Sequence, residues 1–179
     1  MEITSHNLDG YGAPPIDWAR VRNVLTSDIT QAPGTGGPDR HTSWLTTINP
    51  DGTPHVMPVG MVRFDETWYF TSGPRTRKSR NLARDPRCVV SIATHPFDLV
   101  LEGTAERVTE PGELEVVAAA YRDQGWPASV ERQALTAEYS APSAGPPPWH
   151  VYRLVPTTVY ALGTAEPYGA TRFEVGTAR

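Results

Sequence analysis

The sequence is poor in three features that would narrow a protein's function at once: cysteine, lysine and long apolar runs. Its 179 residues contain one cysteine, Cys88, which excludes an internal disulfide framework and any CxxC metal or redox motif. No apolar segment approaches the roughly 18 residues that a membrane-spanning helix needs. The first residues lack the basic start and apolar run of a signal peptide. We therefore expect a cytoplasmic protein with no membrane partner and no metal site.

The charge balance argues against a general nucleic-acid-binding protein. The chain has 16 basic and 20 acidic residues and a formal net charge of −4, whereas nucleic-acid binders usually present a basic face. Among the 16 basic residues only Lys78 is a lysine. The arginine bias and the 18 prolines most simply reflect a GC-rich genome. The position of the single lysine is the exception that we follow below.

The length suits one domain, and an apolar content of 39% is enough for a hydrophobic core. We expect residues 1–179 to form a single domain made of four parts. These parts are an N-terminal helix and loop (1–40), a core barrel (41–110), a helical insertion with a proline-rich loop (111–148), and closing strands with a tail (149–179).

Residues 42–72 have the composition of antiparallel strands joined by tight turns. Strong turn signals occur at residues 49–52 and at Asp65-Glu66. Pro54 and Pro58 limit the ladder of the middle strand to an edge or a bulge. The short connections predict a three-stranded antiparallel meander. Its expected strands are residues 42–48, 53–64 and 67–72.

The rest of the chain alternates between short strands and helices. Further strands are expected at residues 87–94, 99–108, 149–155 and 157–162. Helices are expected near residues 16–25, 75–84, 111–124 and, more weakly, 129–139, and loops at residues 1–15, 31–40 and 141–148. Six or seven short antiparallel strands with peripheral helices predict a mainly β, α+β fold, a small closed barrel.

Residues 69–82 carry the strongest functional signal in the sequence. A strand that ends in hydroxyl residues leads into a helix whose start is basic, although basic residues there oppose the helix dipole. An anion placed opposite would offset that cost, because the first N–H groups of a helix are unpaired. Hydroxyl groups also suit phosphate oxygens. The alternative is a solvated, arginine-rich helix face. The residues involved are Thr71, Ser72, Arg75, Thr76, Arg77, Lys78, Ser79 and Arg80.

This segment, together with the strand at residues 54–59, resembles the pyridoxamine 5′-phosphate oxidase-like family of flavin- and deazaflavin-binding split β-barrels. In that family a strand ending in Tyr-Thr or Phe-Thr leads to a small residue followed by Arg-Lys, which holds the cofactor phosphate. Thr76-Arg77-Lys78 matches this element. The similarity covers about residues 40–110. Framework matches are Thr46-Thr47, residues 51–54, Asn81-Leu82 and Asp85-Pro86.

The resemblance implies an antiparallel split β-barrel that forms a homodimer, with two cofactor sites at the interface. It favours the branch that uses the deazaflavin coenzyme F420, whose longer anionic tail suits Arg75 and Arg80. The implied reaction is hydride transfer from the reduced cofactor to an oxidised small-molecule substrate, and no catalytic residue is assigned. The implied cofactor-binding residues are His55, Val56, Met57, Pro58, Val59, Thr71, Ser72, Arg75, Thr76, Arg77, Lys78 and Asn81.

Several alternatives remain open at this point. The same fold binds FMN in other members, and a non-catalytic carrier of a flavin or a tetrapyrrole is a second possibility. A basic helix that contacts nucleic acid is a third. His55 suits an outward-facing strand position as well as a cofactor contact. The remaining histidines lack metal-ligand spacing, and Cys88 suits a packed apolar position.

Overall fold

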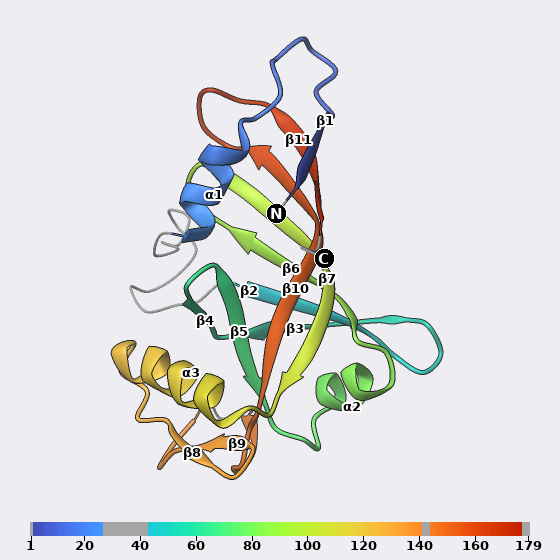
Figure 1. The fold of residues 1–179 in the computed structure, drawn as a ribbon. Coiled ribbons are helices and arrows are strands. Elements are labelled where there is room, and N and C mark those ends of the chain that lie inside the picture. Colours follow the sequence, from blue (N-terminus) through green and yellow to red (C-terminus); the bar gives the residue numbers. More distant parts are fainter. Residues whose placement is uncertain (1, 27–42, 141–143, 177–179) are drawn as a thin grey trace.

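The computed structural model describes residues 2–26, 43–140 and 144–176, and its main feature there is a nine-stranded antiparallel sheet (Figure 1). The expected loop at residues 31–40 lies outside the described residues. The strands of this sheet are β1 (Ile3–Asn7), β2 (Ser43–Ile48), β3 (Pro54–Val59), β4 (Met61–Phe64), β5 (Thr67–Ser72), β6 (Arg87–Ala93), β7 (Phe97–Val108), β10 (His150–Gly163) and β11 (Ala170–Val175). A separate hairpin consists of β8 (Ser129–Glu131) and β9 (Ala134–Thr136), and the helices are α1 (Trp18–Thr26), α2 (Arg77–Arg84) and α3 (Pro111–Asp123).

Strand β10 organises the sheet because it has a different neighbour at each end. The strand order is β1-β11-β10-β7-β6-β2-β3, and β5 pairs with both β10 and β4. The first half of β10 pairs with β5, its second half pairs with β11, and β7 follows it along nearly its whole length. A bulge between Pro156 and Thr158 marks the change. These pairings confirm the predicted mainly β, antiparallel split-barrel fold, with nine strands in the main sheet instead of six or seven.

The predicted three-stranded meander is wrong in one respect. The expected strand at 53–64 breaks at Gly60, so that β3 pairs with β2 while β4 pairs with β5. The chain therefore passes from one part of the barrel to another at this glycine. The apolar run continues through the break, which is why the sequence pattern gave no sign of it.

Three other expectations also need correction. The predicted helix at 129–139 is the β8–β9 hairpin, which turns at Arg132 with a positive φ of 55°. The two strands expected at 149–155 and 157–162 are the single strand β10. The expected loop at residues 1–15 contains β1, which pairs with β11 at the far end of the chain. Only the last of these errors concerns pairing between distant segments, which local residue patterns do not encode.

Other local predictions are confirmed. Helices α1, α2 and α3 occur where they were expected, and strands β2, β5, β6 and β7 match their predicted segments within a few residues. Asp17 accepts a hydrogen bond from the backbone N–H of Ala19 at the start of α1, at 2.9 Å. The turn at residues 49–52 closes with Gly52 at a φ of 84°, a conformation that favours glycine.

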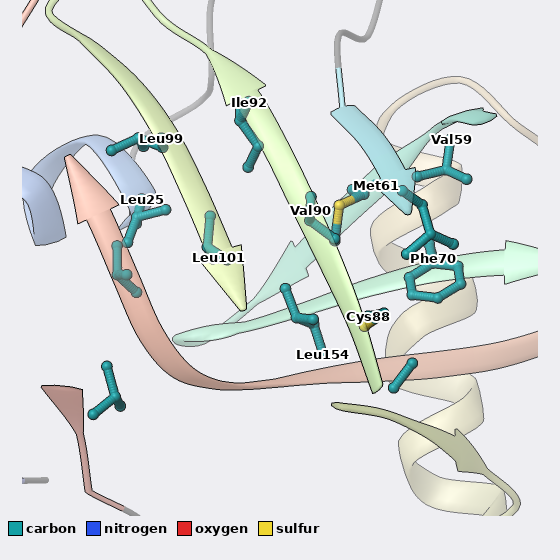
Figure 2. Close-up of a cluster of buried hydrophobic side chains, with 14 of the residues drawn as sticks. Leu25, Val59, Met61, Phe70, Cys88, Val90, Ile92, Leu99, Leu101 and Leu154 are labelled. Carbon is teal, nitrogen blue, oxygen red and sulfur yellow. The ribbon is translucent and has the colours of Figure 1, made fainter. Parts of the chain in front are cut away.

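Two apolar clusters attach α1 and α3 to the barrel, whereas α2 makes few apolar contacts. The barrel interior packs residues such as Leu45, Val90 and Leu154, all at most 3% exposed, and Figure 2 shows Leu25 of α1 directed toward Leu101 of β7. The second cluster buries one face of α3 against the barrel and the β8–β9 hairpin. By contrast, α2 contributes a single apolar side chain, Leu82, to either cluster. Helix α2 is therefore attached mainly by polar contacts.

Cys88 is part of the barrel interior, as predicted. Its side chain is buried among apolar neighbours (Figure 2). Burial raises the pKa of its thiol to about 12, so the reactive thiolate is not populated at neutral pH.

Candidate functional site at the start of helix α2

The turn between β5 and α2 is built so that the helix begins at a fixed place. Thr76 is the N-cap, with an extended backbone and a side-chain oxygen that accepts a hydrogen bond from the N–H of Ser79 at 3.3 Å. The backbone N–H of Thr76 also bonds to the carbonyl of Gly73 at 3.0 Å. A Cβ at position 73 would lie 2.8 Å from the carbonyl oxygen of Ala144, so this close approach requires glycine.

The predicted hydroxyl residues meet one another beneath this helix start. The hydroxyl oxygens of Ser72 and Thr76 are 2.8 Å apart, and the hydroxyl of Ser79 donates to that of Ser72 at 2.8 Å. Ser72 and Ser79 are each only 3% exposed. Thr71 is half-buried and interacts with Tyr121, whose pKa is raised mainly by burial. This network fixes the end of β5 against the first turn of α2.

Four cationic side chains project around the same helix start, and they have no acidic partners among the described residues. Arg75, Arg77 and Arg80 are exposed, and Lys78 is half-buried. The first turn of α2 contains no acidic residue, and the six ion pairs found among the described residues include none of these four cations. Burial lowers the pKa of Lys78. The helix start thus concentrates positive charge that the described residues do not neutralise.

The backbone adds two further donors to this positive region. Among the described residues, no hydrogen-bond partner is found for the backbone N–H groups of Arg77 and Lys78. Such groups at a helix N-terminus are oriented toward an anion that approaches the helix end. The side-chain and backbone donors therefore converge on one region.

Strand β3 lies beside this cationic region. The pKa of His55 is lowered first by burial and then by the positive charges of Arg77 and Lys78, which places the imidazole close to both cations. Asn81, which is only 2% exposed, donates hydrogen bonds from its amide to Thr47 of β2 at 3.0 Å and to Asn49 at 3.1 Å. The hydroxyl of Thr47 in turn lies 3.4 Å from the carbonyl oxygen of His55. Asn81 thus fastens α2 to the β2–β3 hairpin.

The residues of β3 divide between two faces of the sheet, because successive strand side chains alternate. His55, Met57 and Val59 share the face that ends in the core, where Val59 is 7% exposed. Val56 and Pro58 are on the opposite, exposed face, and Pro58 pairs with Trp44 of β2, which is 40% exposed. The structure therefore brings His55 to the cationic region and leaves Val56 and Pro58 on an apolar surface at the edge of the sheet.

A cavity of about 420 Å³ lies next to the helix start. Residues 73–76 line one side of it and residues 144–148 line the other. Arg75 and Thr76 were predicted at the site from the sequence, whereas residues 144–148 were predicted as part of a proline-rich loop. No local signal marked them as a wall, because their position depends on the β10 strand that follows them.

Two other kinds of site are not found in the described part of the chain. Within residues 2–26, 43–140 and 144–176, no group of three His, Cys, Asp or Glu side chains lies close enough together to hold a metal ion. None of the helices there is both long and apolar enough to cross a membrane.

The fold and the site define a class: an antiparallel split β-barrel in which a cationic helix start follows a barrel strand. A family model described as pyridoxamine 5′-phosphate oxidase matches residues 37–163. The chain therefore belongs to the pyridoxamine 5′-phosphate oxidase family. Among curated proteins, no match to this sequence is found.

Solved structures are similar in fold. A conserved hypothetical protein of Mycobacterium tuberculosis is 20% identical, with a TM-score of 0.57 over 84% of this chain and 87% of that one. A protein of unknown function from Agrobacterium tumefaciens is 23% identical, with a TM-score of 0.51 over 68% of this chain and 50% of that one. A heme-binding protein of Mycobacterium smegmatis is 20% identical, with a TM-score of 0.54 over 74% of this chain, and the match spans about half (52%) of that protein. At these identities the likeness shows the fold alone.

Proposed function

We propose that this protein is a deazaflavin-dependent oxidoreductase that transfers hydride from reduced coenzyme F420 to an oxidised organic substrate. The observation that carries the proposal is the cationic start of α2, which has no acidic partner among the described residues and lies beside His55 of β3. Membership of the pyridoxamine 5′-phosphate oxidase family supports a phosphate-bearing cofactor at this place.

The residues present fit the phosphate group of such a cofactor. Arg77 and Lys78 supply two charged donors, and the adjacent backbone N–H groups supply neutral ones. Without an anion, basic residues in a first helical turn cost about 0.3–1 kcal/mol each, because they oppose the helix dipole. A charge-assisted hydrogen bond to phosphate contributes roughly 1.5–3 kcal/mol. The destabilisation that each basic residue causes in the empty helix is thus smaller than the binding free energy that it contributes when it contacts phosphate.

The role of the protein in this reaction is mainly to bind and orient. Arg77 and Lys78 would hold the phosphate, and β3 with His55 would lie along the ring system. When bound, the reduced cofactor supplies the hydride, so the protein needs little acid–base machinery of its own. The remaining task is to hold donor and acceptor in contact and to keep water away. We assign no proton donor.

The proposal includes a homodimer with a cofactor site at the interface between its subunits. Its support is the exposed apolar surface at the edge of the sheet, which includes Trp44, Val56 and Pro58. In a monomer this surface would face water, whereas a second copy would bury it. The same copy would close the open side of the β3 strand.

A binding screen with F420, FMN and heme tests the cofactor assignment. We expect saturable binding of F420, and we expect the reduced form of F420 to be oxidised when enones, quinones or nitroaromatic compounds are added as hydride acceptors. Binding of FMN with none of F420 would replace the deazaflavin assignment with the FMN alternative. Tight binding of any of the three without turnover would instead favour a carrier protein.

A further inference from the structure

A second cavity lies at a different place in the molecule from the proposed cofactor site. It lies between α1, the β1–β11 edge of the sheet and the β4–β5 hairpin, and its volume is about 380 Å³. It shares no lining residue with the cavity beside α2. Figure 1 shows α1 and α2 against opposite ends of the sheet. This second cavity is therefore separate from the proposed cofactor site.

The floor of this cavity is the barrel core itself. Leu25, Leu101 and Val159 line it, and each is at most 9% exposed. Leu25 and Leu101 belong to the same cluster of buried apolar side chains (Figure 2). Water in such a cavity finds few hydrogen-bond partners, so its displacement by an apolar molecule is favourable.

The walls carry two indole rings. Trp18 of α1 and Trp68 of β5 line the cavity, and both are partly buried against the barrel core. The Trp18 ring is itself held by Phe173, at 5.0 Å between ring centroids. Indole faces favour flat aromatic partners, which gain from offset or edge-to-face packing as well as from burial.

The charged groups at this cavity already have partners. Arg22 of α1 donates from its Nε to Glu66 at 2.9 Å and forms an ion pair with the same carboxylate. The hydroxyl of Thr26, the other polar lining residue, donates to the backbone carbonyl of Arg22 at 2.7 Å. Because Arg22 and Glu66 neutralise each other, the cavity offers no net charge to a charged ligand, whereas an uncharged ligand leaves the pair intact.

We propose that this cavity binds an uncharged aromatic molecule of one or two fused rings. The volume supports that size, because a dry apolar cavity of roughly 150 Å³ is enough to hold benzene, and small-molecule sites begin at about 300 Å³. The inference rests on the cavity alone and does not depend on the proposed cofactor or reaction.

The test is a titration with 2-naphthol, which is uncharged at pH 7, followed through the indole N–H signals of the protein by NMR. The chain has five tryptophans, and their signals are assigned with single Trp→Phe variants. We expect saturable shifts of the Trp18 and Trp68 signals, while those of Trp44, Trp126 and Trp149 stay in place. The charged analogue 2-naphthoate is expected to bind at least about tenfold more weakly.

A matched pair of variants tests the location. Ile3→Phe adds a ring at the cavity wall and should weaken 2-naphthol binding by about tenfold, whereas Leu162→Phe adds the same ring at an exposed position outside the cavity and should leave it unchanged. The wild-type NMR readout decides the matter if Ile3→Phe does not fold. The proposal is overturned by non-saturable binding, by shifts at Trp44, Trp126 or Trp149, by tighter binding of 2-naphthoate, or by equal affinity of both folded variants.

Discussion

Helices α2 and α3 pack against the same barrel but carry opposite charges in their first turns. Helix α3 begins with a proline, has Glu113 in its first turn and Arg122 in its last, and so matches the helix dipole at both ends. Helix α2 begins with Arg77 and Lys78 and has no acidic residue in that turn. The comparison separates a helix whose charges suit its dipole at both ends from one whose start carries positive charge against the dipole, which is the pattern expected of a helix start that binds an anion.

The side-chain partners of the two helices show the same difference. Glu113 of α3 accepts hydrogen bonds from Tyr69 at 3.0 Å and from Arg153 at 3.1 Å, and Arg153 also pairs with Glu106 at 2.7 Å. Burial and the neighbouring Glu113 raise the pKa of Tyr69 to about 12. The cations of α2 have no such partners in the described structure. Departures from local stability rules are expected at functional sites.

The largest expected effect is on cofactor affinity. Replacing both Arg77 and Lys78 with alanine should weaken cofactor binding by several kcal/mol, because two charge-assisted contacts of roughly 1.5–3 kcal/mol each are lost. The free energy of unfolding without cofactor should stay the same or rise slightly, because the helix dipole is no longer opposed. Isothermal titration calorimetry and chemical denaturation measure the two quantities.

The matched control for this pair is Arg87→Ala with Arg172→Ala. It removes the same charge from side chains already paired with Asp85 and Glu174. Cofactor affinity should be unchanged in the control. An equal loss of affinity in both double variants would mean that overall charge, and not the helix start, governs binding.

For α3 we expect the opposite result, namely a loss of stability without a loss of cofactor affinity. Tyr69→Phe removes the hydroxyl that donates to Glu113 and should lower the free energy of unfolding by roughly 1.5 kcal/mol. Cofactor affinity should not change. Urea denaturation of the variant and the wild type gives the first value, and a loss of affinity without a loss of stability would contradict the division between the two helices.

A smaller effect on stability is expected at the N-cap of α2. Thr76→Ala removes the oxygen that accepts the N–H of Ser79 and contacts Ser72, at a cost of about 1 kcal/mol. Thr76→Ser retains that oxygen and should recover most of the stability. Thermal denaturation distinguishes the two variants, and equal stability of both would show that the hydroxyl network is unimportant.

The smallest expected effect is a change in the titration of His55. Its pKa lies below the usual 6.5 because of burial and the two neighbouring cations. The unfolded chain therefore takes up this proton first as the pH falls through 6.5, so the contribution of His55 to stability declines in that range. In the Arg77→Ala, Lys78→Ala double variant the pKa should rise toward 6.5. NMR titration of the imidazole signals, assigned with His55→Gln, measures the shift; an unchanged value would place the cations away from His55.

Sequence reasoning reached the cationic helix because its signals are local. A strand ending in hydroxyl residues and a helix with a basic first turn both fall within residues 69–82, and the structure reproduces both elements. That Thr76 caps the helix is seen only in the structure. The sequence could not show that Ser72, Thr76 and Ser79 bond to one another, or that Asn81 anchors α2 to Thr47. Those contacts depend on how β5 and the β2–β3 hairpin are placed in the barrel.

The pairing of distant segments was also beyond local patterns. The break at Gly60, the bulge that lets β10 continue through Pro156, and the pairing of β1 with β11 are all set by barrel closure. The β8–β9 hairpin was interpreted as a helix because its few apolar residues fit either period. The backbone of its Leu135 pairs with Trp149, which a helix would not allow.

The most direct test of the central claim compares a cofactor with its phosphate-free counterpart. FMN and riboflavin differ by the phosphate alone, whereas F420 and its deazaflavin chromophore differ by the phosphate together with the anionic tail that it carries. If the start of α2 holds the phosphate, wild-type protein should bind the phosphate-bearing member at least about a hundredfold more tightly, equivalent to about 2.8 kcal/mol. The Arg77→Ala, Lys78→Ala variant should lose most of that preference. Equal affinity of the wild type for both members of the pair that it binds would contradict the account.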